Sequence, residues 1–500
     1  MINKTKKILV MLLLFTLPMA FLQGCLKKEA ETKAVAFKPV ELVYYKLFDD
    51  EDVMKPMIQQ YQATHPTVTI KYKKFDSTAD YYRTILNNLA EGEGPDIFSV
   101  PNYWLLNNSR KLTPMPADYY APKTFADTFV SVAANDCIFA DPRDGVSKVF
   151  AIPLSVDTLA LYYNKSLFED KIPSRGKPAT TWTDFKDDVF KLTKADNSFE
   201  RFELAGTAMG RADNIGLSVD ILYMLMLQYK TSFYNDGLTL AQFAKQQAIG
   251  ENGVSINPAT EALKLYTSFG LASQKNYSWN EYMVESNSTA KELEAFARGK
   301  VATIFGYSYT LQQIKDEIEQ LKKLSVNTIN PDFIKLALVP QVNDPSVSTE
   351  KRDAFANYYV ETVGRNSEHA DVAWDFLQFI SSKDNLAYYN QKTHRPTSRR
   401  DMIEEQKQDA VYGVFAEQVG FAESFPIYDW DIYKQNFSVA INAVLNTAPV
   451  KDSISKAEEA INKSMPPDGI LPPAPIKPVT KATTAPATAA KTTTTTTPAK

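Results

Sequence analysis

The chain has 500 residues, of which 44% are hydrophobic and 23% charged, and its formal net charge is −4. This composition is typical of a soluble globular protein that buries its core without needing disulfides or metals. The lack of a basic excess argues against nucleic acid as the main partner.

The N-terminal segment predicts export. A lysine-containing start followed by an apolar run over residues 8–21 has the pattern of a signal peptide over residues 1–24, and the run is short for a membrane-spanning helix. The Leu-Gln-Gly-Cys motif that ends at Cys25 resembles a bacterial lipobox, which implies that Cys25 is acylated and becomes the mature N-terminus. The alternative is an uncleaved anchor with an incidental cysteine. Residues 25–37 are expected to form a polar tether, and Cys137 to be a lone buried thiol.

Both interpretations of Cys25 place the protein outside the cytoplasm and on a membrane. We expect a lipid anchor on the outer face of the cytoplasmic membrane, or on the periplasmic side where an outer membrane exists. Such an anchor would hold the protein close to any membrane partner.

Strands and helices alternate from residue 40. The acidic run at residues 49–52 could suggest a cation site, but we favour the start of a helix, where negative charge suits the helix dipole. The predicted elements are strands at 40–44, 68–72 and 96–100 and helices at 53–61 and 81–89. This alternation predicts a parallel sheet with both faces covered by helices.

The α/β pattern recurs further along the chain. Strands are predicted at 158–163, 204–209 and 301–305, and helices at 182–192, 291–298 and 372–380. Thr181 and Asp184 form a capping box at the start of the first of these helices. No internal repeat and no further membrane-spanning stretch is present in the sequence.

Residues 466–500 are rich in proline, threonine, alanine and lysine. Because such a segment lacks apolar residues for a core, we predict that it is disordered and extended. It is either a spacer or wall-associated stalk or a tail without a specific role, and composition does not separate these readings.

Catalytic and metal motifs are sparse. The three histidines, His65, His369 and His394, are not at metal-ligand spacing, and the sequence contains neither a phosphate-binding loop nor a GxSxG nucleophile motif. Paired carboxylates for glycoside hydrolysis remain open, because the two acids can lie far apart in the chain. We therefore predict a protein that is not an enzyme and needs no cofactor or metal.

Six segments in order resemble the extracellular solute-binding proteins of ABC importers, in the maltose-binding-like family. They include a GPDI strand, a YYNK turn, the helix start PATTWTDF and the segment FARGKVATIFGYSY. The matching segments are residues 40–75, 89–105, 151–169, 178–185, 296–309 and 426–445. The resemblance implies an α/β fold of the periplasmic-binding-protein type, with two lobes joined by hinge strands and a ligand cleft between them.

The resemblance also implies a domain division and a function. We expect lobe 1 to comprise residues 38–154 and about 353–396, and lobe 2 to comprise residues 155–352 and about 397–465. The expected function is capture of a small solute, a sugar or oligosaccharide, by lobe closure and its delivery to an ABC permease. We expect a monomer. Alternatives are a surface-tethered glycan hydrolase and an adhesion or sensing lipoprotein that uses its tail.

The predicted binding residues follow strand ends, because ligands of open α/β sheets bind beyond the carboxyl ends of the strands. Aromatic rings and planar polar groups there suit the faces and hydroxyls of a sugar. The predicted ligand-binding residues are Phe48, Asp49, Asn102, Trp104, Asp157, Arg211, Asp213, Tyr307, Tyr428 and Trp430.

Several of these residues have a second interpretation. Trp104 and Trp430 could be core aromatics, and Asp157 could orient the hinge instead of touching the ligand. Arg211 could pair with Asp213 on the surface. Tyr307, which follows a glycine at a strand end, is the strongest single prediction.

Overall fold

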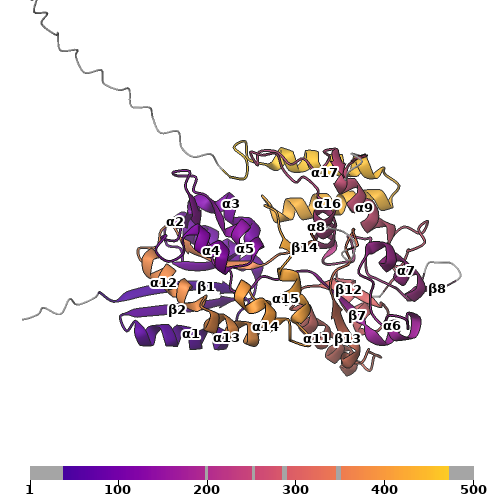
Figure 1. Ribbon diagram of the computed structural model, residues 1–500, viewed down its shortest axis with the longest axis horizontal. Helices are drawn as coiled ribbons and strands as arrows, with labels where there is room; N and C mark the ends of the chain where they lie inside the picture. The colour runs from indigo at the N-terminus through magenta and orange to yellow at the C-terminus, as the bar shows by residue number, and fades with distance from the viewer. Residues whose placement is uncertain (1–37, 197–200, 250–253, 284–289, 345–350, 472–500) are drawn as a thin grey trace, which may run out of the picture. The chain divides into compact units, whose positions relative to one another are not determined.

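The structure is a computed structural model that describes residues 38–196, 201–249, 254–283, 290–344 and 351–471 (Figure 1). The predicted signal peptide, Cys25 and the tether lie outside the described residues, as do residues 472–500 of the predicted tail. In the described part of the chain, no helix is both long and apolar enough to cross a membrane.

The first sheet has five strands in the order β2-β1-β3-β15-β4. The strands are β1 Val40–Leu47, β2 Val68–Phe75, β3 Ile97–Pro101, β4 Leu112–Thr113 and β15 Tyr359–Gly364. Strand β1 runs parallel to β2 and β3, as the alternation predicts, while β15 returns late in the chain and runs antiparallel to β3 and β4.

Helices cover this sheet. They are α1 Glu51–Thr64, α2 Thr78–Glu91, α3 Leu105–Asn108, α4 Pro122–Thr128, α5 Ser131–Cys137, α12 Ala370–Ile380, α13 Lys383–Thr393 and α14 Ile403–Gln406. The acidic run does open a helix, since Asp50 is the N-cap residue of α1 and two acids lie in the first turn. Helix α1 buries Met54, Met57 and Ile58 at helical spacing, and each such side chain contributes about 1.5 to 3 kcal/mol.

The second main sheet has the order β12-β7-β13 and is entirely antiparallel. Its strands are β7 Ala160–Asn164, β12 Thr303–Gly306 and β13 Ile334–Ala337. Its helices are α6 Lys165–Lys171, α7 Trp182–Leu192, α8 Ser218–Gln228, α9 Pro258–Ser268, α10 Lys291–Ala297, α11 Thr310–Lys323, α15 Gly413–Val419, α16 Trp430–Leu445 and α17 Val450–Ser464. Thr181 caps α7 as expected, accepting a hydrogen bond from the Asp184 amide at 3.1 Å.

The prediction of a strand over residues 204–209 is mostly wrong. Strand β9, Phe202–Leu204, ends where that prediction begins, and only Ala205 continues it, through an isolated bridge to Val301. The physical reason is close packing against α7, because a Cβ on Gly206 would lie 2.5 Å from the carbonyl oxygen of Val189. Gly210 then takes a φ of +100°, which only glycine adopts readily and which turns the chain away from a strand.

The buried side chains divide into two main cores, which we call lobe 1, around the first sheet, and lobe 2, around the second. Val156 belongs to the core of lobe 1 and Leu159 to that of lobe 2, so the chain crosses between them here. It returns between Phe355 and Ala356. Cys137 is a free, buried thiol in lobe 1. The exact lobe boundaries stay a prediction.

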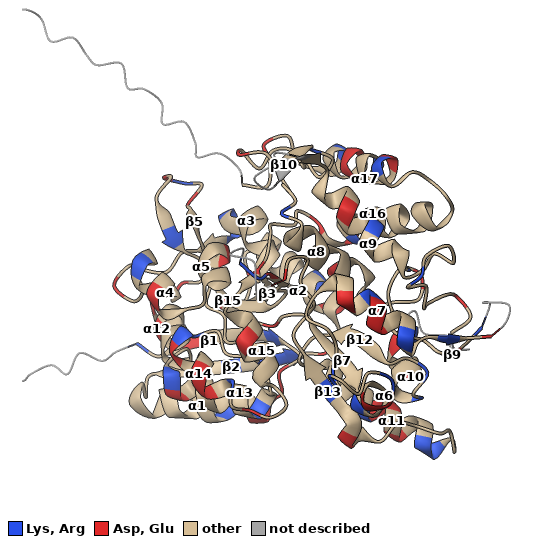
Figure 2. Cartoon of the chain, turned by 45° about the vertical axis from the view of Figure 1, so that its right-hand side comes forward, with Lys and Arg blue, Asp and Glu red and all other residues tan. Residues whose placement is uncertain are grey.

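Short strand pairs complete the described fold. They are β5 Ile138–Ala140 with β6 Ser147–Val149, β8 Lys194–Ala195 with β9, β10 Gln247–Ile249 with β11 Val254–Ile256, and β14 Ala354–Phe355 with β16 Ala422–Glu423. The β14–β16 pair runs parallel beside the crossing at Phe355 and Ala356. Helix α11 carries both acidic and basic residues, with Lys322 and Lys323 in its last turn (Figure 2).

Candidate functional site

A cluster of buried charges lies at the carboxyl end of β1 in lobe 1. The Asp49 carboxylate contacts Arg395 Nη1 at 2.8 Å and Lys46 Nζ at 3.3 Å, and it accepts a hydrogen bond from the Tyr389 hydroxyl at 2.7 Å. Lys46 also forms an ion pair with Glu361 of β15. Burial alone would raise the pKa of Asp49, but Lys46 and Arg395 hold it below its usual value. The cluster therefore remains charged and fixes Arg395 in place.

Phe48 follows β1 in a strained conformation. Its φ is +72°, a region that bulky residues avoid at a cost of about 1 to 3 kcal/mol. Its amide donates to the carbonyl of Phe75 at 2.8 Å, and its ring meets Tyr359 edge to face at a centroid distance of 6.2 Å. The side chain is nonetheless 45% exposed, so an aromatic ring is presented to solvent beside the charged cluster.

Asp157 lies where the chain passes from lobe 1 to lobe 2. Its carboxylate accepts hydrogen bonds from the Ser308 hydroxyl at 2.6 Å, the Ser308 amide at 3.1 Å and the Thr158 amide at 2.9 Å. Burial raises the pKa of Asp157 to about 6, while Ser308 and then Arg395 oppose this rise. Asp157 thus ties the crossing segment to the loop after β12 and lies within electrostatic reach of Arg395.

Tyr307 and Asp220 form a buried pair in lobe 2. The Tyr307 hydroxyl donates to Asp220 Oδ1 at 2.7 Å, and burial raises the pKa of both groups. Tyr309 stacks on Tyr307 with a centroid distance of 5.8 Å and is 48% exposed. Burial, followed by Asp220 and Asp157, raises the pKa of Tyr309, while Arg395 lowers it. The half-exposed Tyr309 ring is therefore close to charged groups from both lobes.

The lobes also meet through aromatic side chains. Tyr103, just before α3, stacks on Trp430 at the start of α16 with a centroid distance of 5.1 Å and an interplanar angle of 18°. Asn107 of α3 donates from Nδ2 to the carbonyl of Tyr428 at 3.2 Å. Burial raises the pKa of Tyr103, and Tyr359 of lobe 1 and Asp220 of lobe 2 add to this rise. The Tyr103 ring is therefore near residues of both lobes.

Two of the predicted residues, Tyr428 and Trp430, make contacts from lobe 2 to lobe 1, and Asp157 lies on the crossing segment. Phe48 and Asp49 make their ring and ion-pair contacts within lobe 1, and the Tyr307 hydroxyl makes its contact within lobe 2. Whether any of them contacts a ligand stays a prediction.

The other four predicted residues make contacts within a single lobe, and a binding role for them stays a prediction. Asn102 donates to Asp136 Oδ2 at 2.9 Å within lobe 1. Trp104 packs on the lobe 1 core, edge to face with Phe98 and under the ammonium group of Lys111.

Arg211 and Asp213 form a bidentate pair in lobe 2. The hydrogen bonds from Arg211 to the Asp213 carboxylate measure 2.9 and 2.7 Å, and Arg211 also contacts Glu281 at 2.7 Å. This is the surface pairing that the sequence left open as the alternative to a binding role.

The contacts between the lobes also involve residues outside the ten predicted binding residues. Arg395, Tyr103, Tyr309 and Asp220 lie among the contacts between the lobes. Asp220 had a sequence signal, since it is the single charged residue in the otherwise apolar or uncharged helix α8. Arg395 follows His394, whose φ of +55° ends α13, and no local pattern links it to Asp49.

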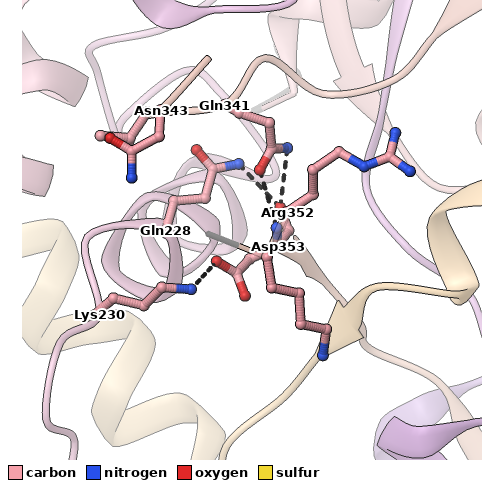
Figure 3. A pocket seen from close by; sticks show the side chains of 8 residues that line it. Gln228, Lys230, Gln341, Asn343, Arg352 and Asp353 are labelled. Carbon is pink, nitrogen blue, oxygen red and sulfur yellow. Dashed lines mark hydrogen bonds and ion pairs between the residues drawn. The ribbon is translucent and has the colours of Figure 1, made fainter. Parts of the chain in front are cut away.

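A small cavity lies beside β14 and is lined by other residues (Figure 3). Its volume is about 10 Å³, room for one water molecule. Gln228 and Gln341 donate to the carbonyl of Asp353, and Lys230 pairs with its carboxylate (Figure 3). These polar contacts support β14, and the cavity is too small for a solute.

A larger groove of about 440 Å³ lies near α14 and α15. Two of its cations pair with its two carboxylates, Arg352 with Glu417 at 3.1 Å and Lys407 with Glu404 at 3.1 Å, and Lys351 and Arg400 also line it. No predicted binding residue lines either cavity. In the described residues, no group of three or more histidine, cysteine or acidic side chains could hold a metal ion.

Comparison with known proteins identifies the family. Residues 56–412 match the family model described as bacterial extracellular solute-binding protein. A protein of Brucella abortus (strain 2308) that is named as a binding protein is 22% identical over 417 residues, which cover 81% of this chain and 88% of that protein.

Solved structures agree on the fold. The sugar-binding protein MalE of Xanthomonas citri superposes with a TM-score of 0.66 at 16% identity, covering 85% of this chain and 97% of that one. A cyclo/maltodextrin-binding protein complexed with maltotetraose gives a TM-score of 0.63 at 16% identity, covering 86% and 98%. A solute-binding protein of Thermotoga lettingae bound with α-D-tagatose gives 0.59 at 18% identity, covering 85% and 99%.

The expected α/β fold of the periplasmic-binding-protein type, with its maltose-binding-like architecture, is thereby confirmed. A family model that spans most of the described lobes identifies this chain as a member of the bacterial extracellular solute-binding protein family.

Proposed function

We propose that this protein binds a small carbohydrate between its two lobes, without transforming it, and delivers it to an ABC permease from a lipid anchor on Cys25. The observation that carries the proposal is that the two lobes meet through aromatic and hydrogen-bonding side chains, with Tyr103 stacked on Trp430 and Asn107 bonded to the Tyr428 carbonyl. Lobe 1 contributes the half-exposed Phe48 and the fixed guanidinium of Arg395, and lobe 2 contributes Tyr309, Asp220 and Trp430.

The chemistry of these groups suits a sugar. Aromatic rings stack on the C–H faces of a pyranose, and carboxylate and guanidinium groups pair with its hydroxyls. Related folds support the same ligand class, since neighbours are bound to maltotetraose and to tagatose. The ligand would be held by contacts that exist only when both lobes face it.

The proposed mechanism is a shift of the equilibrium between separated and closed lobes. Tyr103 and Trp430 stack directly on each other, so these rings must part before a sugar can lie between them. A ligand that contacts both lobes then favours the closed arrangement by its difference in affinity for the two states. The permease would recognise that closed arrangement.

Binding is tested by calorimetry of the full chain against a panel of mono-, di- and oligosaccharides, after mass spectrometry of any ligand that co-purifies. We expect saturable binding to one saccharide class, with no products detected by chromatography. Tyr309→Ala should lose tenfold or more in affinity, equivalent to about 1.4 kcal/mol, because it removes a ring from the site. The matched control is Tyr282→Ala, a tyrosine that is 65% exposed and outside the contacts between the lobes.

Each alternative function predicts a different result. Turnover of a glycan would support the hydrolase, and absence of saturable saccharide binding would overturn the sugar proposal. Deletion of residues 472–500 should leave solute uptake intact, whereas an adhesion or sensing protein that acts through its tail would lose surface association.

The anchor is tested separately. Cys25→Ser should abolish incorporation of labelled fatty acid and release the protein from the membrane, with saccharide binding in solution unchanged. Retention of Cys25→Ser on the membrane would instead indicate an uncleaved N-terminal anchor.

A further inference from the structure

Helix α17 is fixed to lobe 2 by side chains near its C-terminal end. Asn462 accepts a hydrogen bond from the Ala241 amide at 2.7 Å and donates to the Ala241 carbonyl at 3.0 Å. One turn earlier, Glu458 accepts from the Ala244 amide at 2.6 Å. These bonds position the chain that leaves α17 against the loop around residue 238.

The chain then turns onto that loop. The Gly469 amide donates to the carbonyl of Pro466 at 2.9 Å, and Gly469 takes a φ of +81°. A Cβ on Gly469 would lie 2.7 Å from the carbonyl oxygen of Leu238, so this turn requires glycine. The Ile470 amide donates to the same Leu238 carbonyl at 3.0 Å, and the Ile470 side chain is fully buried in the core of lobe 2.

The next residue contacts the other lobe. Leu471 packs against the core of lobe 1, although Ile470 belongs to the core of lobe 2. Figure 1 shows this yellow end of the described chain leaving α17 in the direction of α3. Helix α3 is the element whose neighbour Tyr103 stacks on Trp430, and its Leu106 packs against both cores.

We propose that residues 466–471 are a clip that ties lobe 2 to lobe 1 and limits how far the lobes separate. If the lobes move apart, Leu471 must leave lobe 1 while Ile470 stays anchored in lobe 2, because one peptide unit joins them. The clip favours the closed arrangement even without a ligand. It acts on the lobes themselves and does not depend on the identity of the solute.

The test measures the distance between the lobes without ligand. Spin labels are attached at Lys123→Cys on α4 of lobe 1 and at Lys264→Cys on α9 of lobe 2, in the full chain carrying Cys25→Ser. Both sites are exposed, and Cys137 is buried and so protected from the label. In Leu471→Ser we expect the distribution measured by double electron–electron resonance to gain a longer-distance component.

Two further variants make the result decisive. Leu324→Ser, at a leucine that is 73% exposed after α11, should leave the distance distribution of the parent unchanged. Gly469→Ala keeps both apolar side chains but blocks the turn, and it should reproduce the longer component. If Leu471→Ser and Gly469→Ala fold, as circular dichroism would report, and both give the parent distribution, the clip is refuted. Because no saccharide is present, this outcome is independent of the sugar proposal.

Discussion

The two lobes stabilise their buried carboxyl groups in different ways. Lobe 1 uses balanced charge: Lys46 and Arg395 surround Asp49, and their attraction holds the pKa of that carboxyl below its usual value in spite of burial. In lobe 2, burial raises the pKa of Asp220, although hydrogen bonds from Tyr307 and Asn357 and the charge of Lys434 oppose this rise. A buried cluster of paired charges is rigid and costly to break, whereas a carboxyl held by neutral donors responds to pH.

The largest expected effect comes from breaking the paired cluster. Lys46→Met should lower the free energy of unfolding by about 3 to 5 kcal/mol, because it leaves Glu361 and Asp49 buried with less compensation. Burial alone would lower the pKa of Lys46, but Glu361 outweighs it and raises this pKa well above its ordinary value, so the lysine is charged in the folded protein. Urea denaturation measures the change.

The matched control for Lys46→Met is Lys71→Met on β2. Lys71 forms an ion pair with Glu41 at 2.7 Å, and both side chains are more than half exposed. Such surface pairs contribute about 0 to 1 kcal/mol. Equal losses in the two variants would show that the lobe 1 cluster is not the strong element described above.

The second expected effect is a difference in pH response between Asp157, on the segment that crosses between the lobes, and Asp49 in lobe 1. The Asp157 pKa of about 6, against an ordinary value of 3.8, means that the folded state binds a proton before the unfolded state as the pH falls. Stability from this group is therefore greatest below about pH 4 and decreases as the pH rises through 6, by about 1 to 3 kcal/mol. The difference between the parent and Asp157→Asn in urea denaturation at each pH isolates this contribution.

Asp49 should show the opposite slope. Its lowered pKa means that its contribution is present above the unfolded value and is lost as the pH falls through the folded value. A parent-minus-Asp157→Asn difference that stays flat from pH 4 to pH 7 would contradict the contrast between the two carboxyls.

The third expected effect comes from the hydrogen-bonded pair of Tyr307 and Asp220 in lobe 2. Tyr307→Phe should lower the free energy of unfolding by about 1 to 3 kcal/mol, because Asp220 loses its 2.7 Å donor and the contact with Asn357, at 3.5 Å, is longer. The control Tyr282→Phe removes a hydroxyl from an exposed ring and should be neutral. Thermal and urea unfolding check both variants, and a neutral Tyr307→Phe would mean that the pair contributes little.

The amino-acid sequence predicts the local elements well and the contacts between distant segments poorly. The β1-α1-β2-α2-β3 order was predicted correctly, because each element there carries its own periodicity and Gly92 ends α2 in the left-handed conformation. The charged cluster around Lys46 was not predicted. Its partner Glu361 lies 315 residues away in the sequence, and the pairing depends on the position of β15 in the sheet. The strand over 204–209 failed for a similar reason, because contact with α7 overrides the local pattern at Gly206.

The smallest expected effect comes from a substitution at Phe48 that removes backbone strain and also removes a ring from the proposed binding site. Phe48→Gly should raise the free energy of unfolding by about 1 kcal/mol, since glycine accepts the φ of +72° that phenylalanine adopts with strain. It should also weaken saccharide binding several-fold, because the half-exposed ring is lost from the site.

The control for Phe48→Gly is Ser325→Gly. Ser325 has a φ of +59° just after α11, at the opposite end of this helix from Tyr309, so Ser325→Gly should gain stability without any change in affinity. Because strained residues persist where function requires them, only Phe48 should exchange binding for stability. If Phe48→Gly gains stability and binds as tightly as the parent, the strain after β1 serves the fold of lobe 1 alone, and the aromatic contribution to binding would have to come from Tyr309 and Trp430.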